Sequence, residues 1–350
     1  MLRYPRASKE EKMSKRTIIF TVFAATLIAV GIYLSGASMK KAASPLELMT
    51  RIPFDSRSYK MLTVGDNLVL YNDRGLFMAQ LSSPVANETT EQIDGNIASV
   101  FYGKVSKKLF VQQNKKGVLV FDWDDTTNPA NSQTQNSNYE PAMLFTEDSK
   151  GNVYIAEAYK IHKYSSIDGK WSTLETGYPD PTYDGSIVSL VTIDDKPVVG
   201  LNFMRGQSSW LVNFDKNILD PLSIEDRRSG TIPNVTTKSG RSFELGGNCL
   251  CEIELTDSNV TVLRKFVEVG SQYLYNLIIS GDTIVGFGED NSYQMFDINS
   301  KLETVAPFAT GTPSYITGPN ESIRYVFSTG VENELIVVTF GTLYRLKLNF

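Results

Sequence analysis

Histidine and cysteine are almost absent from this chain of 350 residues, which has one histidine, His162, and two cysteines, Cys249 and Cys251. Ser-His-Asp and Cys-His catalytic sites and histidine-rich metal sites therefore have almost no residues from which to form. Two cysteines one residue apart point to the same face of a strand and supply no disulfide framework. We expect a structural or surface role for His162 and a fold that is stabilised by packing.

After residue 55 the chain also has no long amphipathic helical pattern. Tyr (17) and Phe (18) are plentiful, and this aromatic and β-branched bias favours strands. Hydrophobic residues make up 41% and charged residues 21%, which is typical of a folded globular protein. The sequence therefore predicts an all-β domain.

Residues 17–34, TIIFTVFAATLIAVGIYL, contain neither a charge nor a proline. As a helix this run is about 27 Å long, enough to cross a bilayer core. Basic residues are concentrated before it, which by the positive-inside rule makes residues 1–16 a short cytoplasmic tail. The sequence predicts a transmembrane signal anchor at 17–34, a linker at 35–44 and an extracytoplasmic domain, in a cell envelope or lumen, at 45–350.

The same segment is compatible with a cleaved signal peptide. Ser35, Gly36 and Ala37 provide the small residues of a cleavage site, and cleavage would release a secreted protein. The apolar run is longer than the core of most signal peptides, which favours the anchor.

Charge is divided unevenly along the chain. Residues 1–41 contain eight of the 34 Lys and Arg and two of the 39 Asp and Glu, so residues 42–350 have 26 basic and 37 acidic residues, a net charge of −11. Such a domain is expected to repel nucleic acid. The acidity agrees with cationic or basic partners, or with solubility alone.

A pair of adjacent strands recurs seven times between residues 67 and 348. The clearest copy is NLVLY-NDRG-LFMAQL at 67–81, and the others are KLFVQQ-NKKG-VLVFDW, NVYIAE-AYK-IHKYS, KPVVGLNF-MRGQSS-WLVNFD, RSFELG-GN-CLCEIEL, DTIVGFG-EDNS-YQMFDI and ELIVVTF-GT-LYRLKL. Their centres are about 41 to 45 residues apart, with one step of about 52, which is typical of four-stranded propeller blades.

Each pair needs an inner strand before it and an outer strand after it. Apolar runs predict inner strands at 98–103, 142–146, 186–193 and 273–280, and outer strands are predicted at 170–176, 260–266 and 302–308. The inner strand of the fifth copy, within 230–237, is weakly marked, and residues 126–138 resemble a loop.

The two ends of the chain complement each other. The last copy stops after its third strand, and residues 46–54, LELMTRIPF, resemble the predicted outer strand LETVAPF at 302–308. We expect this N-terminal strand to complete the last blade, which would close the ring and remove two open edges.

This pattern resembles the seven-bladed β-propeller superfamily over residues 45–350. Tyr164, Asp168, Gly169, Lys170 and Trp171 are similar to the hairpin of kelch repeats. The paired glycines of kelch blades and the Gly-His/Trp-Asp pair of WD repeats are missing, so the resemblance implies the fold without a subfamily.

Carboxylates are the remaining candidates for catalysis. Asp122, Asp124 and Asp125 cluster at a strand end, and Asp180 and Asp184 flank Pro181. Paired acids serve glycosidases or bind calcium, although strand-end aspartates are also common turn residues. These residues support an alternative function, a hydrolase or lyase that uses Asp122, Asp124 and Asp184, with or without calcium.

Long loops are the other candidates. Residues 126–139, 177–185 and 308–322 stand out, and Tyr139, Tyr178 and Tyr183 are aromatic residues suited to protein or glycan contacts. The sequence therefore predicts a membrane-tethered, non-enzymatic binding or scaffold module for a protein or glycan partner at one propeller face. It names no cofactor and no metal site.

Overall fold

The computed structural model describes residues 44–65, 67–81, 90–122, 133–135, 142–176, 186–203, 206–224, 235–236, 241–246, 249–256, 259–266, 274–288, 290–316, 321–329 and 331–349. Residues 45–350 form one compact unit. The predicted transmembrane segment, residues 17–34, lies outside the described residues. No helix in the described part of the chain is long and apolar enough to cross a membrane.

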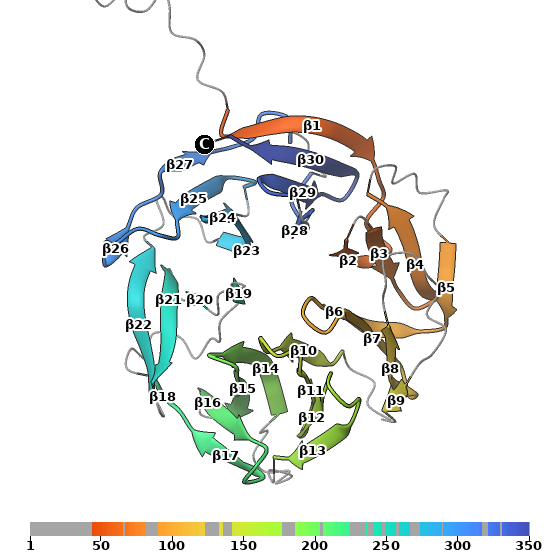
Figure 1. Cartoon of the computed structure of the whole chain (residues 1–350). Coiled ribbons are helices and arrows are strands. Elements are labelled where there is room, and N and C mark those ends of the chain that lie inside the picture. Colours follow the sequence, from red (N-terminus) through yellow and green to blue (C-terminus); the bar gives the residue numbers. More distant parts are fainter. Residues whose placement is uncertain are drawn as a thin grey trace, which may run out of the picture. The chain divides into compact units, whose positions relative to one another are not determined.

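Seven antiparallel sheets stand around a central channel, which confirms the predicted seven-bladed propeller (Figure 1). Blades one to three each contain four consecutive strands. Blade one consists of β2 (Lys60–Val64), β3 (Asn67–Tyr71), β4 (Gly75–Gln80) and β5 (Thr90–Asp94). Blade two consists of β6 (Ile97–Gly103), β7 (Lys108–Gln113), β8 (Gly117–Asp122) and β9 (Gln133–Gln135). Blade three consists of β10 (Leu144–Glu147), β11 (Val153–Glu157), β12 (Lys160–Tyr164) and β13 (Trp171–Glu175).

Blades four to six follow the same plan, except that two short strands are added to blade five. Blade four consists of β14 (Ser186–Ile193), β15 (Lys196–Phe203), β16 (Gly206–Asn213) and β17 (Ile218–Pro221). Blade five consists of β19 (Val235–Thr236), β20 (Ser242–Gly246), β21 (Cys249–Thr256) and β22 (Asn259–Phe266), and β18 (Ser223–Ile224) and β26 (Thr304–Val305) pair with β22 in parallel. Blade six consists of β23 (Leu274–Ser280), β24 (Thr283–Gly288), β25 (Tyr293–Asp297) and β27 (Ala309–Gly311).

Blade seven joins the two ends of the domain. It contains β28 (Tyr325–Ser328), β29 (Glu334–Val338) and β30 (Thr342–Leu348), and β1 (Leu46–Pro53) pairs antiparallel with β30 as its outer strand. The predicted closing strand is therefore confirmed.

Three details differ from the sequence prediction. Residues 302–308 do not form the outer strand of blade six, because Thr304 and Val305 pair with β22 of blade five and β27 takes the outer position. Pro307 has no N–H to donate to a ladder there. A short strand, β9, lies within the predicted loop 126–138. The hairpin of blade four is longer than expected, because Gly206–Ser209 pair with β15.

The core consists of seven apolar layers, one between each pair of neighbouring blades. Alternate residues of a strand point to opposite faces, so β3 directs Leu68 and Leu70 toward blade seven and Val69 toward blade two. The second strand of a blade is therefore buried on both faces and mostly apolar, as in β24, whose six residues are all buried. This packing provides the main stabilisation of the ring.

Strand direction alternates within each blade, so the connections alternate between two faces of the ring. The first face carries residues 54–59, 72–74, 95–96 and 290–292. The second face carries residues 104–107, 148–152, 194–195 and 281–282. β1 begins at the second face and ends at the first.

Candidate functional site

Two adjoining cavities lie on the first face, over blade one, and we call them together the cleft. The outer cavity has a volume of about 490 Å³ and the inner cavity about 470 Å³. They share a wall of four residues: Ser58, Tyr59, Asn72 and Asp73. Both volumes lie in the range of small-ligand sites.

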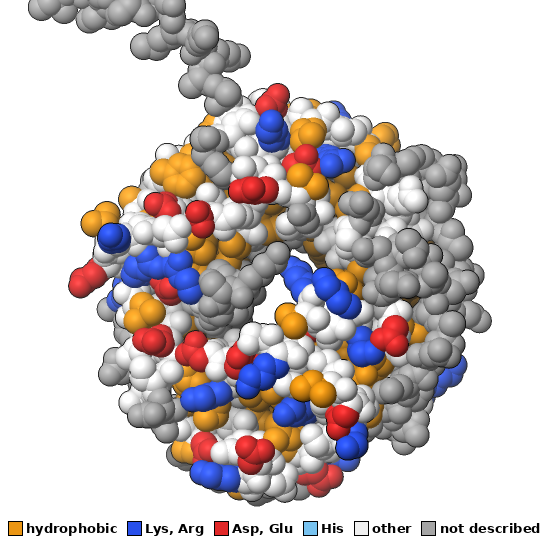
Figure 2. All heavy atoms as spheres, viewed as in Figure 1, with side chains coloured by type: hydrophobic (Ala, Val, Ile, Leu, Met, Phe, Trp, Pro, Cys, Tyr) orange, Lys and Arg blue, Asp and Glu red, His pale blue; other side chains and the backbone are white. Residues whose placement is uncertain are grey.

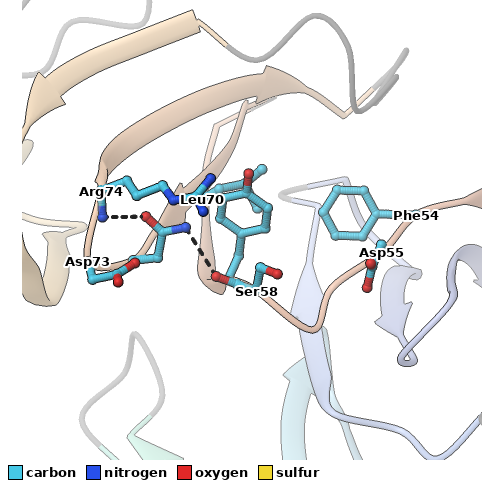
Figure 3. Close-up of a pocket in the computed structure, with 8 residues that line it drawn as sticks. Phe54, Asp55, Ser58, Leu70, Asp73 and Arg74 are labelled. Carbon is cyan, nitrogen blue, oxygen red and sulfur yellow. Dashed lines mark hydrogen bonds between the residues drawn. The ribbon is translucent and has the colours of Figure 1, made fainter.

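The outer cavity is formed by the β1–β2 connection and the β3–β4 turn (Figure 3). Its lining consists of Phe54, Asp55, Ser58, Tyr59, Leu70, Asn72, Asp73 and Arg74. The Asn72 side chain holds the two segments together, because its Nδ2 donates to Ser58 O at 3.2 Å and its Oδ1 accepts from the Arg74 N–H at 2.8 Å. Asparagine suits this position because its side chain readily bonds turn N–H groups.

The inner cavity extends to the mouth of the channel, where the inner strands of several blades begin. Besides the shared wall it is lined by Arg57, Lys60, Tyr71, Asn96, Ile97, Ala98, Ala142 and Arg324. Tyr71 ends the second strand of blade one, and the others lie at or just before the starts of blades one, two, three and seven. A ligand here would therefore contact several blades.

Arg324 is held rigidly at the edge of the inner cavity. Its Nη1 donates to Ser56 O at 2.7 Å. The guanidinium carbon lies 5.3 Å from the centre of the Tyr325 ring and 4.9 Å from that of Phe340. Cation–π contacts and a backbone hydrogen bond fix the orientation of its charge.

Positive charge is concentrated in the inner cavity. Arg57, Lys60 and Arg324 line it together with a single carboxylate, that of Asp73. In the described part of the chain, none of the three cations forms an ion pair. Burial, with a smaller contribution from nearby Tyr325, raises the pKa of Tyr71 to about 12.

The lining offers binding groups rather than a recognisable catalytic arrangement. Its hydroxyls are those of Ser58, Tyr59 and Tyr71, and no histidine lies among its residues. Within the described residues no three His, Cys, Asp or Glu side chains group as metal ligands. The arrangement is suited to holding a polar, partly charged ligand by hydrogen bonds and ion pairs.

Of the site residues predicted from the sequence, only Asp122 is described. It ends β8 at the second face, where its carboxylate pairs with the Lys108 ammonium, so it does not face the cleft. Asp124, Asp184, Tyr139, Tyr178 and Tyr183 lie outside the described residues, and their roles stay predictions. Ala142, three residues after Tyr139, lines the inner cavity.

His162 and Cys251 are both buried. His162 Nδ1 lies 2.9 Å from Thr173 Oγ1, and Nε2 lies 3.1 Å from Glu157 Oε1, within blade three. This environment gives His162 a structural role. Cys251 packs in the apolar layer between blades four and five.

The cleft residues Arg57, Asn72 and Arg324 are not among the site residues predicted from the sequence. The turn signal Asn72-Asp73-Arg74-Gly75 was visible between two strands, and a polar segment follows the closing strand. No signal in the sequence indicates that Arg324 meets Ser56, since 268 residues separate them.

The face of the ring that Figure 2 shows carries mixed charges rather than one uniform field. In the face that Figure 2 shows, acidic and basic side chains are interspersed around the channel, and Lys and Arg side chains gather beside its opening. Local groups of cations therefore stand out on a domain that is acidic as a whole.

Comparison with known proteins gives the fold alone. No known family profile matches the chain, and no curated protein is similar to it in sequence. Among solved structures, the WD40 β-propeller domain of Doa1 is similar with a TM-score of 0.53 and 11% identity, covering 87% of this chain and 97% of that domain. The β-propeller domain of Myceliophteria thermophila Cps50 (Swd1) has a TM-score of 0.59 and 10% identity, covering 87% and 100%. Together with the seven blades, closed by the pairing of β1 with β30, these likenesses show that residues 45–350 are a seven-bladed β-propeller without an assignable subfamily.

Proposed function

We propose that the protein is a membrane-tethered, extracytoplasmic binding module that holds a partner in the cleft over blade one and catalyses no reaction. The observation that carries this proposal is the cleft itself: two joined cavities whose walls come from four blades. Propellers commonly bind at a face where loops surround the channel mouth. Between the two partner classes predicted from the sequence, we choose a protein that offers an extended peptide segment, with a glycan as the alternative outcome.

The composition of the cleft supports a peptide. Asn96 and Ser58 offer both donors and acceptors of the kind that pair with backbone amides, and Tyr59 and Tyr71 offer flat apolar surface with a polar end. Tyrosine provides much of the binding energy in many protein interfaces.

A tether before residue 45 is compatible with access to this cleft. β1 starts at the second face, whereas Phe54 and Asp55, directly after its end, line the outer cavity at the first face. The start of β1, to which the tether is attached, and the cleft therefore lie on opposite faces of the ring.

The binding proposal is tested with a random peptide display library and a glycan array, each probed with the full chain purified in mild detergent. Ser58 is exposed and belongs to both cavities, so Ser58→Trp fills the cleft. Ser172→Trp, at an exposed position on the outer strand of blade three, is the matched control. We expect peptides whose binding is abolished by Ser58→Trp and kept by Ser172→Trp. If only glycans bind, the partner is a glycan instead of a peptide. If no bound ligand is lost in Ser58→Trp, the proposal is wrong.

The tether is tested separately. Membranes that contain the full chain are extracted with alkaline carbonate, and we expect the chain to stay in the pellet and a chain without residues 17–34 to appear in the supernatant. Protease added to sealed vesicles of known orientation reports the side on which residues 45–350 lie. A full chain released by carbonate would contradict the anchor.

A further inference from the structure

We propose that the inner cavity binds the carboxylate of an Asp or Glu side chain in the partner peptide, with Arg324 as the residue that positions it. This inference rests on the proposed function and adds the chemistry that selects the partner. It follows from the pre-organised guanidinium, the local charge and the continuity of the two cavities.

Most N–H donors of the Arg324 guanidinium have no partner in the described part of the chain. Only Nη1 is engaged, with Ser56 O at 2.7 Å and Ser56 Oγ at 3.4 Å, and within the described residues Nε and Nη2 have no acceptor. A guanidinium held by two aromatic rings loses little freedom when it binds an anion. Its planar set of N–H groups matches a carboxylate.

The surrounding charge has the sign that a carboxylate requires. Arg57, Lys60 and Arg324 against Asp73 give the inner cavity a formal charge of +2. The outer cavity has Arg74 against Asp55 and Asp73, a formal charge of −1. Residues 42–350 have a net charge of −11, so the charge of the inner cavity is opposite in sign to that of its domain. Complementary charge of this kind selects partners and speeds their association.

The outer cavity explains why the anion belongs to a peptide. The shared wall makes the two cavities continuous, so a ligand that placed only a free anion in the inner cavity would leave about 490 Å³ beside it unfilled. The outer cavity adds the apolar surfaces of Phe54, Tyr59 and Leu70. An acidic residue followed by an apolar or basic residue fits both halves.

The experiment uses the peptides selected on the full chain as described above. We expect enrichment of Asp or Glu at one position, and a lead peptide is synthesised with Glu, Gln or phosphoserine there. Gln should weaken binding at least tenfold, measured by fluorescence anisotropy. The double variant Arg57→Glu/Lys60→Glu changes two exposed cations of the inner cavity and should also weaken binding at least tenfold.

The matched control is Lys104→Glu/Lys107→Glu, an equal charge change on two exposed lysines of the second face, and it should change the affinity less than twofold. Arg324→Lys keeps the charge without the planar donors. It should weaken binding of the Glu peptide at least fivefold and leave the melting temperature of the protein unchanged. Since Arg324 also holds Ser56, the exposed double variant decides the matter if Arg324→Lys is unstable.

The outcomes separate the two proposals. One result is that the selected peptides lose binding to Ser58→Trp and yet have no enriched acidic residue, and another is that they bind equally well with Gln at that position. Either result would refute the carboxylate site and leave the proposed binding function intact. If the phosphoserine peptide binds more than tenfold more tightly than the Glu peptide, the inner cavity is a phosphate site and the proposed carboxylate site is refuted. If no peptide is sensitive to Ser58→Trp, the proposed function itself fails.

Discussion

Leu46 of β1 lies directly opposite Leu348 of β30, and both side chains are almost fully buried, with 1% and 2% exposure. They pack in the apolar layer between blades six and seven. The closure of the ring therefore depends on apolar burial as well as on the backbone ladder of β1 and β30.

Replacing Leu46 with Ala should lower the free energy of unfolding by about 2–4 kcal/mol, because it leaves a cavity in this layer. Met49 lies at the bulge of the same strand with 46% exposure, so Met49→Ala should cost less than about 0.5 kcal/mol. Urea unfolding followed by tryptophan fluorescence measures both. Equal effects would show that β1 contributes only its backbone.

Glu252 binds two arginines in blade five. Its carboxylate accepts from Arg241 Nε at 2.6 Å and from Arg264 Nε at 2.5 Å, and its side chain is 5% exposed. Glu252→Gln removes the buried carboxylate charge that both arginines bind and should cost about 2–4 kcal/mol. Glu254→Gln, at an exposed position on the same strand, should be close to neutral in the same unfolding assay. A neutral Glu252→Gln would mean that water satisfies both arginines.

Asp195 of blade four accepts from Ser149 N at 2.8 Å and Ser149 Oγ at 2.6 Å in blade three. The hydroxyl bond is the main cause that lowers the pKa of Asp195 below its usual range. A lowered pKa adds stability above the unfolded-state pKa of about 4, and this stability is lost as the pH falls through the folded-state value.

Ser149→Ala should therefore cost about 0.5–1 kcal/mol at pH 7, and the difference from the parent should vanish toward pH 2. Denaturant unfolding at several pH values measures it, with Ser172→Ala as the pH-independent control. A cost that does not change with pH would exclude Asp195 as its source.

Gly151 has φ of +80°, and a Cβ placed there would lie 3.0 Å from Ser166 Oγ and 3.2 Å from Ser106 N of the neighbouring blade. Gly151→Ala should therefore cost about 1–3 kcal/mol through backbone strain and crowding. Gly341→Ala adds a Cβ with nothing within 4 Å and should change stability by less than about 0.5 kcal/mol. Thermal unfolding of the pair provides the comparison, and equal melting temperatures would contradict the strain.

The blades were predictable because their second strands must be apolar on both faces, a pattern visible in residues such as Leu68, Val69 and Leu70. The closing strand was predictable because the last copy lacks an outer strand. The partner of residues 304–305 was not, since a short strand gives no sign of which of two neighbouring edges it meets.

The cleft was even less predictable. Its walls depend on contacts such as Arg324 with Ser56 and Asn72 with Ser58, which form only after the chain has completed the ring. Polar residues in connections have no periodicity that reveals their spatial neighbours. The sequence therefore predicted a binding site on long loops, whereas the described cavities lie over short connections between strands.

The pairing of β1 with β30 has a consequence for the order of folding. Residues 46 and 348 are among the most distant in the chain, so their contact has a high loop-closure cost and is expected to form late. During synthesis β1 is the first strand of the domain to emerge, and its edge stays unpaired until β30 has been made. Its bulge at Met49 and its terminal Pro53 interrupt the ladder that a foreign strand would need, which protects the waiting edge from aggregation.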